Sequence, residues 1–155
     1  MATGINLKKE ATSASVDSDH ERLQVDANGY LQQVDSAGNA FPIGEFYLMT
    51  QLATLSTSSS AFVAAPAAGL VTELRTVITN AITSADATVT AEIEDVAITG
   101  ISITVTQSGS AAGDVDSDTA TAANTLAAND ALEVVTNGNS STACVTPATF
   151  SVQRT

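Results

Sequence analysis

The sequence is poor in aromatic residues. It contains no Trp, two Tyr and four Phe among 155 residues. Aromatic rings bury about 150 to 250 Å² each and dominate both hydrophobic cores and binding hot spots. The positions of these six rings are therefore informative about what the chain packs against.

Basic residues are also scarce. Five Lys and Arg stand against seventeen Asp and Glu, which gives a net charge of −12 and a pI near 4.1. The five are scattered along the chain as Lys8, Lys9, Arg22, Arg75 and Arg154. Because nucleic-acid binding needs clustered cations that release counterions from phosphates, we expect no nucleic-acid partner.

The chain has a single cysteine and no long apolar run. One cysteine, Cys144, excludes an intrachain disulfide and a multi-cysteine zinc site, so we expect it to behave as a small buried hydrophobe. The longest nearly apolar stretch, residues 61–71, is interrupted by Pro66 and Gly69 and is shorter than the ~20 residues that span a bilayer. Residues 1–15 lack the apolar core of a signal peptide. We therefore expect no membrane partner and no secretion by that route.

Alternation of apolar and polar residues is the clearest structural signal. In residues 87–94, Val89, Ala91 and Ile93 face one way and polar residues the other, which is typical of a half-buried strand. The same period recurs at residues 101–105, 132–134 and 150–152, and strands are also expected at residues 60–64 and 70–78. Turn signals rich in Pro, Gly and Asn separate these segments. The sequence thus predicts an all-β fold, an antiparallel β-sandwich that is jelly-roll-like.

The amino-terminal third has a different character. Residues 1–24 are polar and turn-rich, which favours an extended arm. Two similar units follow, residues 25–30 and 34–41, each with a hydrophobe, an Asp, a Gly/Asn turn and a ring. Asn28-Gly29 is a type I′ turn signal, so these units predict a small β-hairpin or meander. Residues 46–55 fit either period, and we interpret them as extended. We expect an arm and hairpin in residues 1–55 and the sandwich in residues 56–155.

One acidic segment has the spacing of a cation site. Asp114, Asp116 and Asp118 place three carboxylates at alternate positions, as in loops that bind Ca²⁺. An EF-hand would need Gly and a carboxylate where Thr119 and Thr125 stand. A solvated acidic loop within residues 107–123 is the alternative reading, and we expect no cofactor.

No catalytic motif occurs in the sequence. His20 is the only imidazole and stands in the polar arm, and the nucleophile-elbow, dinucleotide, P-loop and zinc-protease patterns are all missing. Paired carboxylates such as Glu92 and Glu94 fall on an expected solvent face. The sequence therefore favours a protein that is not an enzyme.

The ring-rich segment is the best candidate for a binding element. Tyr30, Phe41, Phe46 and Tyr47 are four of the six rings and lie within eighteen residues. Such rings could fold back over the sandwich, or they could bind a partner. Under the second reading the anchor set consists of nine residues: Val25, Tyr30, Leu31, Val34, Phe41, Ile43, Phe46, Tyr47 and Leu48.

Three segments carry a resemblance to a known family. They are residues 62–70 (FVAAPAAGL), residues 86–93 (DATVTAEI) and residues 124–134, in which Asn124-Thr125-Leu126 leads to Asp130-Ala131-Leu132-Glu133-Val134. From residue 62 onward the chain resembles the β-sandwich of tailed-bacteriophage head decoration, or cement, proteins. The resemblance covers about the last 95 residues.

The resemblance implies a virion structural protein. Its members bind the outer surface of an assembled capsid, often as trimers, and an amino-terminal arm or hairpin commonly makes the contacts. For this chain that implies the major capsid protein as partner, a homotrimer, synthesis in the host cytoplasm and a final place on the outer capsid surface. A receptor- or glycan-binding sandwich of a phage fibre is the alternative, with function in loops such as residues 107–123.

Overall fold

The computed structural model describes residues 22–25, 31–34, 37–38 and 40–154. Its regular structure is entirely β-strand, which confirms the predicted all-β class. This part of the chain has no helix that could span a membrane. The chain divides into two compact units, Met1–Glu45 and Phe46–Thr155.

The amino-terminal unit contains a three-stranded antiparallel sheet. Strands β1 (Arg22–Val25), β2 (Leu31–Val34) and β3 (Ala40–Pro42) lie in sequence order, so the predicted meander is confirmed. The Ile43 amide adds a hydrogen bond of 2.9 Å to the Leu31 carbonyl just beyond β3. The expected Asn28-Gly29 turn lies outside the described residues.

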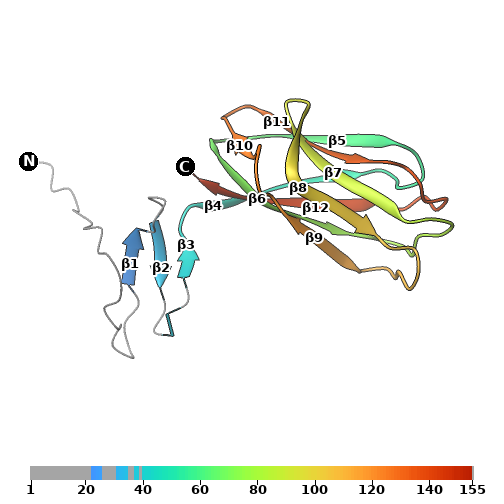
Figure 1. Ribbon diagram of the computed structural model, residues 1–155, viewed down its shortest axis with the longest axis horizontal. Coiled ribbons are helices and arrows are strands. Elements are labelled where there is room, and N and C mark those ends of the chain that lie inside the picture. Colours follow the sequence, from blue (N-terminus) through green and yellow to red (C-terminus); the bar gives the residue numbers. More distant parts are fainter. Residues whose placement is uncertain (1–21, 26–30, 35–36, 39, 155) are drawn as a thin grey trace, which may run out of the picture. The chain divides into compact units, whose positions relative to one another are not determined.

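The second unit begins with one sheet of four antiparallel strands. The order is β5 (Ser59–Ala64), β11 (Ala131–Thr136), β7 (Ala87–Ile93) and β8 (Val96–Val105) (Figure 1). We call this the four-stranded sheet. In β7 every second residue is fully buried, as the alternation predicted.

The other sheet of this unit has five strands. The order is β10 (Thr125–Leu126), β6 (Gly69–Val77), β12 (Thr146–Arg154) and β4 (Glu45–Leu52), and β9 (Val115–Thr119) also pairs with β6. Residues 46–52 therefore belong to the sandwich, and the boundary between units falls ten residues before the expected one. Leu48 and Leu52 explain the difference, since both are buried on the inner side of β4.

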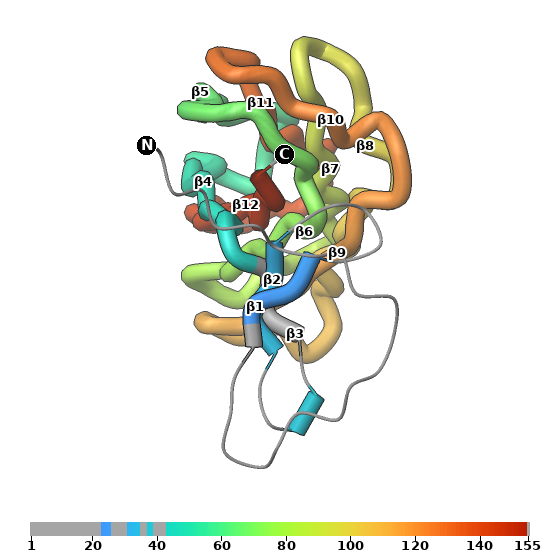
Figure 2. The backbone as a smooth tube through the Cα atoms, turned by 90° about the vertical axis from the view of Figure 1, so that its left-hand side faces the viewer, coloured from blue at the N-terminus to red at the C-terminus, as the bar shows by residue number. Residues whose placement is uncertain are grey.

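The two sheets lie face to face, as Figure 2 shows from the end of the sandwich. One apolar core fills the space between them. Both sheets contribute side chains, which confirms the predicted β-sandwich. The jelly-roll topology is not confirmed by this strand order. The largest fully buried residues are Phe150, Leu52, Leu55, Leu74, Ile78, Ile82, Leu126 and Leu132. Cys144 is buried among them, as expected for a small hydrophobe.

The segment expected to be one long acidic loop contains a strand. Residues 107–123 include β9, whose residues 115–119 pair with residues 73–77 of β6. Asp is depleted in strands and occupies two of the five positions of β9, so the acidic composition favoured a loop. The ladder of backbone hydrogen bonds to β6 overrides that local preference.

Both open edges of the sandwich are bridged by a side chain. On one side the Thr50 hydroxyl on β4 donates to the Phe62 carbonyl on β5 at 3.2 Å. On the other side the Asp118 carboxylate on β9 accepts from the Ser102 amide on β8 at 3.0 Å. Gly100 permits this second approach, because a Cβ there would lie 2.6 Å from the Thr119 carbonyl oxygen. The two sheets are thus held together at their edges as well as through the core.

One glycine allows the β11–β12 loop to pack closely against the β4–β5 connection. Gly138 has a φ of +71°, and a Cβ at this position would lie 2.0 Å from the Ser58 nitrogen. Nearby, the Ser140 amide donates to the Leu55 carbonyl at 3.1 Å. No side chain fits between these two backbones, so the contact requires glycine.

Candidate functional site

The structure divides the anchor set between different environments. In the amino-terminal unit Val34 is buried, Val25 and Leu31 are half-buried, and Ile43 is exposed. Tyr30 lies outside the described residues, as does the side chain of Phe41. Leu23, which was not among the predicted residues, is 56% exposed on β1.

The remaining anchor residues lie on β4, whose side chains point alternately toward the core and toward the outside. Leu48 is buried in the sandwich core, and Phe46 packs against that core. The Arg154 guanidinium lies 5.7 Å from the centre of the Phe46 ring, a cation–π geometry. Tyr47 and Met49 point the other way and are 59% and 73% exposed. Only the second pair remains accessible to a partner.

Exposed apolar side chains are concentrated near the amino terminus of the described chain. Eight large hydrophobic residues are exposed in the whole of the described chain, and four of them lie between residues 22 and 49: Leu23, Ile43, Tyr47 and Met49. The 27 residues from 46 to 72 carry no charge, although the chain has seventeen carboxylates. The side chains of this segment therefore bring no charge of their own into a contact with an apolar partner surface.

The three aspartates with calcium-like spacing do not form a cage. The Asp114 carboxylate accepts from the Ala111 amide at 2.6 Å, and Asp118 accepts from the Ser102 and Thr119 amides. Their ligand oxygens are not gathered within 4.8 Å of one another in the described structure. Asp114 and Asp118 serve instead as acceptors that fix the ends of β9.

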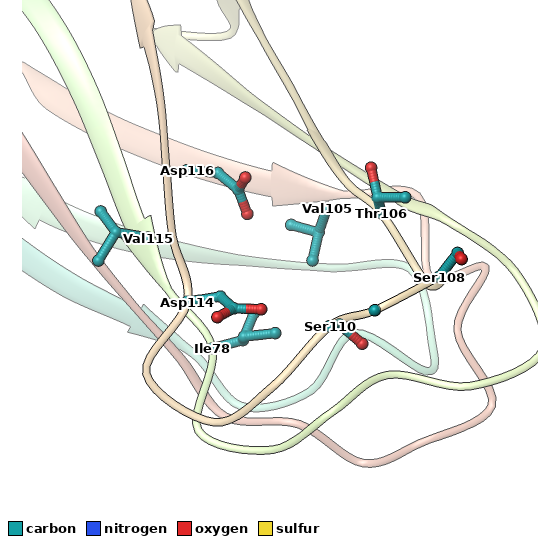
Figure 3. Close-up of a pocket in the computed structure, with 9 residues that line it drawn as sticks. Ile78, Val105, Thr106, Ser108, Ser110, Asp114, Val115 and Asp116 are labelled. Carbon is teal, nitrogen blue, oxygen red and sulfur yellow. The ribbon is translucent and has the colours of Figure 1, made fainter.

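Asp114 and Asp116 line a shallow pocket of about 240 Å³ at one end of the sandwich. Figure 3 shows them on one wall, with Thr106, Ser108 and Ser110 on the β8–β9 connection. Burial, and secondly the charge of Asp114, raises the pKa of Asp116 above its ordinary value. The pocket therefore combines hydroxyls with a carboxylate that is harder to ionise than usual.

A second acidic group lies on the outer face of the four-stranded sheet. Carboxylate oxygens of Glu92, Asp95 and Glu133 all lie within 4.8 Å of one another. Glu92 on β7 and Glu133 on β11 are direct cross-strand partners. Asp95 belongs to the tight β7–β8 turn, in which Glu94 and Asp95 have φ values of +48° and +64°. This group requires the tertiary register and was not among the sequence predictions.

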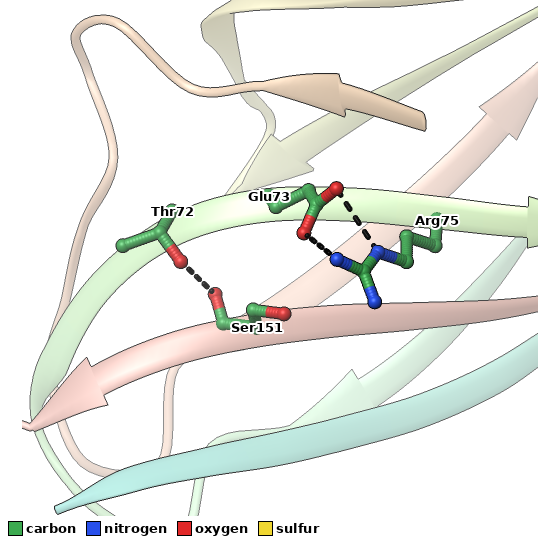
Figure 4. Close-up of polar contacts among 4 residues, drawn as sticks. All are labelled: Thr72, Glu73, Arg75 and Ser151. Atoms are coloured by element: carbon green, nitrogen blue, oxygen red, sulfur yellow. Dashed lines mark hydrogen bonds and ion pairs between the residues drawn. The ribbon is translucent and has the colours of Figure 1, made fainter. Parts of the chain in front are cut away.

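The two described arginines of the sandwich are both engaged by the five-stranded sheet. Arg75 forms a two-point contact with Glu73, with an Nη2 to Oε2 distance of 2.8 Å and an Nε to Oε1 distance of 3.0 Å. Figure 4 shows this pair beside the hydrogen bond from the Thr72 hydroxyl to the Ser151 carbonyl. Arg154 covers Phe46. Neither arginine belongs to a strand of the four-stranded sheet.

Comparison of the chain with protein-family models, curated proteins and solved structures finds no match. Function therefore has to be inferred from the chain's own residues. Of these, the strongest candidates are the exposed side chains of Leu23 and Ile43 in the amino-terminal unit and of Tyr47 and Met49 at the start of the second unit.

Sequence reasoning missed Leu23, Met49 and Phe62, which are 56%, 73% and 60% exposed. For Met49, the period of β4 was a usable signal, because Leu48 and Leu52 identify the inner face and leave Tyr47 and Met49 outside. For Phe62 the signal was weaker, since the alternating strand 59–64 has small side chains on both faces.

Proposed function

We propose that this chain is a non-enzymatic virion structural protein that binds the outer surface of a capsid and stabilises the shell. The observation that supports this best is the exposure of Leu23 and Ile43 in the amino-terminal unit and of Tyr47 and Met49 at the start of the second unit, whose residues 46–72 carry no charge. The sequence resemblance to head decoration proteins suggests the partner, the major capsid protein, and a homotrimeric state on the virion surface.

The proposed contact works by burial of apolar area. Full burial of a large apolar side chain gains about 1.5 to 3 kcal/mol, so these four partly exposed residues could together supply several kcal/mol. A protein that binds assembled shells but not separated subunits stabilises the shell by mass action.

A substitution test compares these contact residues with other exposed apolar residues of the same chain. Leu23→Ser with Met49→Ser replaces one proposed contact residue in each unit, and Val96→Ser with Val115→Ser replaces two valines of the sandwich that are 59% and 61% exposed. The readout is co-sedimentation of each full-length variant with capsids that lack this protein. We expect the first pair to reduce the bound fraction strongly and the second to leave it unchanged. Equal binding by all forms would disprove the proposed surface.

A glycan- or receptor-binding module is the second candidate. The pocket lined by Thr106, Ser108 and Ser110 beside Asp114 and Asp116 favours it, because these hydroxyls and carboxylates could bond to sugar hydroxyls. Reproducible hits on a glycan array that Asp116→Asn abolishes would favour this function over capsid binding.

A further inference from the structure

The outer face of the four-stranded sheet carries an exposed aromatic ring next to a row of like charges. The register pairs Phe62 on β5 with Glu133 on β11, and Glu133 with Glu92 on β7. Phe62 is 60% exposed, and both glutamates are half-buried. Neighbouring strands lie ~4.8 Å apart, so the row from the ring to Glu92 spans about 10 Å.

This arrangement breaks a local rule of sheet stability. Like charges on directly opposite residues destabilise an antiparallel pair, and Asp95 brings a third carboxylate within 4.8 Å of both. No strand of this sheet contains Lys or Arg. The two described arginines of the sandwich are held at Glu73 and Phe46. Local conflicts of this kind are expected where the surface serves an interaction.

The chemistry of the row selects a cationic partner with a planar group. A guanidinium can bond two carboxylate oxygens at once and stack on an aromatic face, whereas an ammonium acts as a point charge. Glu133 lies between the ring and Glu92, so one arginine side chain can reach both a carboxylate and the ring. Residues 46–155 contain ten carboxylates and two arginines. The resulting excess of negative charge attracts a cationic partner over longer distances.

We propose that this face, formed by Phe62, Glu133, Glu92 and Asp95, is a docking surface for an arginine-bearing segment of a partner protein. The partner is complementary in charge to the acidic row, and its guanidinium stacks on the exposed ring. None of these four residues is among the four side chains proposed to contact a capsid, although Phe62 belongs to the uncharged stretch of residues 46–72. Substitutions at Glu92 and Glu133 therefore test this docking surface without changing the side chains proposed to contact a capsid.

The test uses the full-length chain and a fluorescent tetra-arginine peptide, with fluorescence anisotropy at physiological ionic strength. Glu92→Gln with Glu133→Gln should raise the Kd at least about tenfold, since each tenfold step corresponds to one lost charge-assisted contact of about 1.4 kcal/mol. The matched control, Glu73→Gln with Asp116→Asn, changes the net charge equally on the other sheet. It should leave the Kd within about twofold.

Phe62→Leu distinguishes a stacked guanidinium from simple charge attraction. This variant should weaken binding of tetra-arginine more than binding of tetra-lysine, because Leu keeps the apolar area but removes the aromatic face on which a planar guanidinium stacks. Circular dichroism checks that each variant keeps its β spectrum.

Four outcomes would overturn the proposal. The control variant could weaken peptide binding as much as the Glu92→Gln, Glu133→Gln variant does, which would show that the attraction is non-specific. Tetra-arginine could fail to bind the wild-type chain. Calcium chloride could bind with saturable heat that the glutamate variant loses, which would make the row a cation site. Phe62→Leu could abolish self-association, which would assign the face to a second copy.

Discussion

Replacing Gly138 with Ala should destabilise the sandwich severely for two separable reasons. The first is the backbone, since φ is +71° and a left-handed conformation costs an L-residue about 1 to 2 kcal/mol. The second is steric overlap between the new methyl group and neighbouring backbone atoms. The new methyl group would lie 2.0 Å from the Ser58 nitrogen and 2.1 Å from the Thr57 carbonyl carbon, and both neighbours are backbone atoms that have to move. Overpacking of this kind typically costs a further 1 to 3 kcal/mol, so we expect a total of about 2 to 5 kcal/mol.

A glycine in the β8–β9 connection provides the control. Gly109 has a similar φ of +82°, but a Cβ there would meet nothing within 4 Å. Gly109→Ala should therefore show the backbone cost alone. Urea denaturation of both full-length variants, followed by circular dichroism, gives the two free energies of unfolding, and the difference between them isolates the overlap. If the two variants lost the same stability, the tight packing of residues 57 and 58 against Gly138 would be refuted.

Three further changes test other parts of the sandwich. Burial raises the pKa of Asp116 above its ordinary value of 3.8. Protonated Asp116 therefore stabilises the folded state fully below pH 3.8, and this stabilisation is lost as the pH rises through the pKa of the folded state. Asp116→Asn should then raise Tm at neutral pH, and the difference should vanish in acid; a lower Tm at neutral pH would contradict this. Asp118→Ala should speed hydrogen exchange at the Ser102 amide, whereas Asp130→Ala, which removes a bond to Ala127, should not. Phe150→Ala should cost about 3 to 5 kcal/mol in urea denaturation, and a loss below 1 kcal/mol would contradict its central place in the core.

Most of the sandwich could be predicted from the sequence because its strands bury one face. In β7 and β11 the buried residues alternate strictly, so the apolar pattern predicts both the strand and its inner side. The extended reading of residues 46–55 was confirmed by β4 for the same reason. Where one side of a strand faces the core and the other faces water, a single sequence carries enough information.

The candidate surfaces were less predictable, because they depend on which strands become neighbours. Strand β9 was missed since its residues 115–119 have no apolar face, and only pairing with β6 makes them extended. The Glu92 and Glu133 pair is separated by forty residues and follows from the β7–β11 register. The rings of the anchor set were grouped by sequence distance, but the period of β4 places Phe46 inside and Tyr47 outside.

The chain enters and leaves the sandwich at the same end. Phe46 opens the unit, Arg154 lies over its ring, and Gly69 is the register partner of Arg154. The β8–β9 and β11–β12 connections lie at the opposite end, about 30 Å away along the nine residues of β12 (Figure 1). A sequence fused after β12 would therefore emerge beside the start of β4, whereas a peptide inserted at Gly109 would be presented at the far end. The open surroundings of Gly109 make that loop the better place to display a foreign peptide.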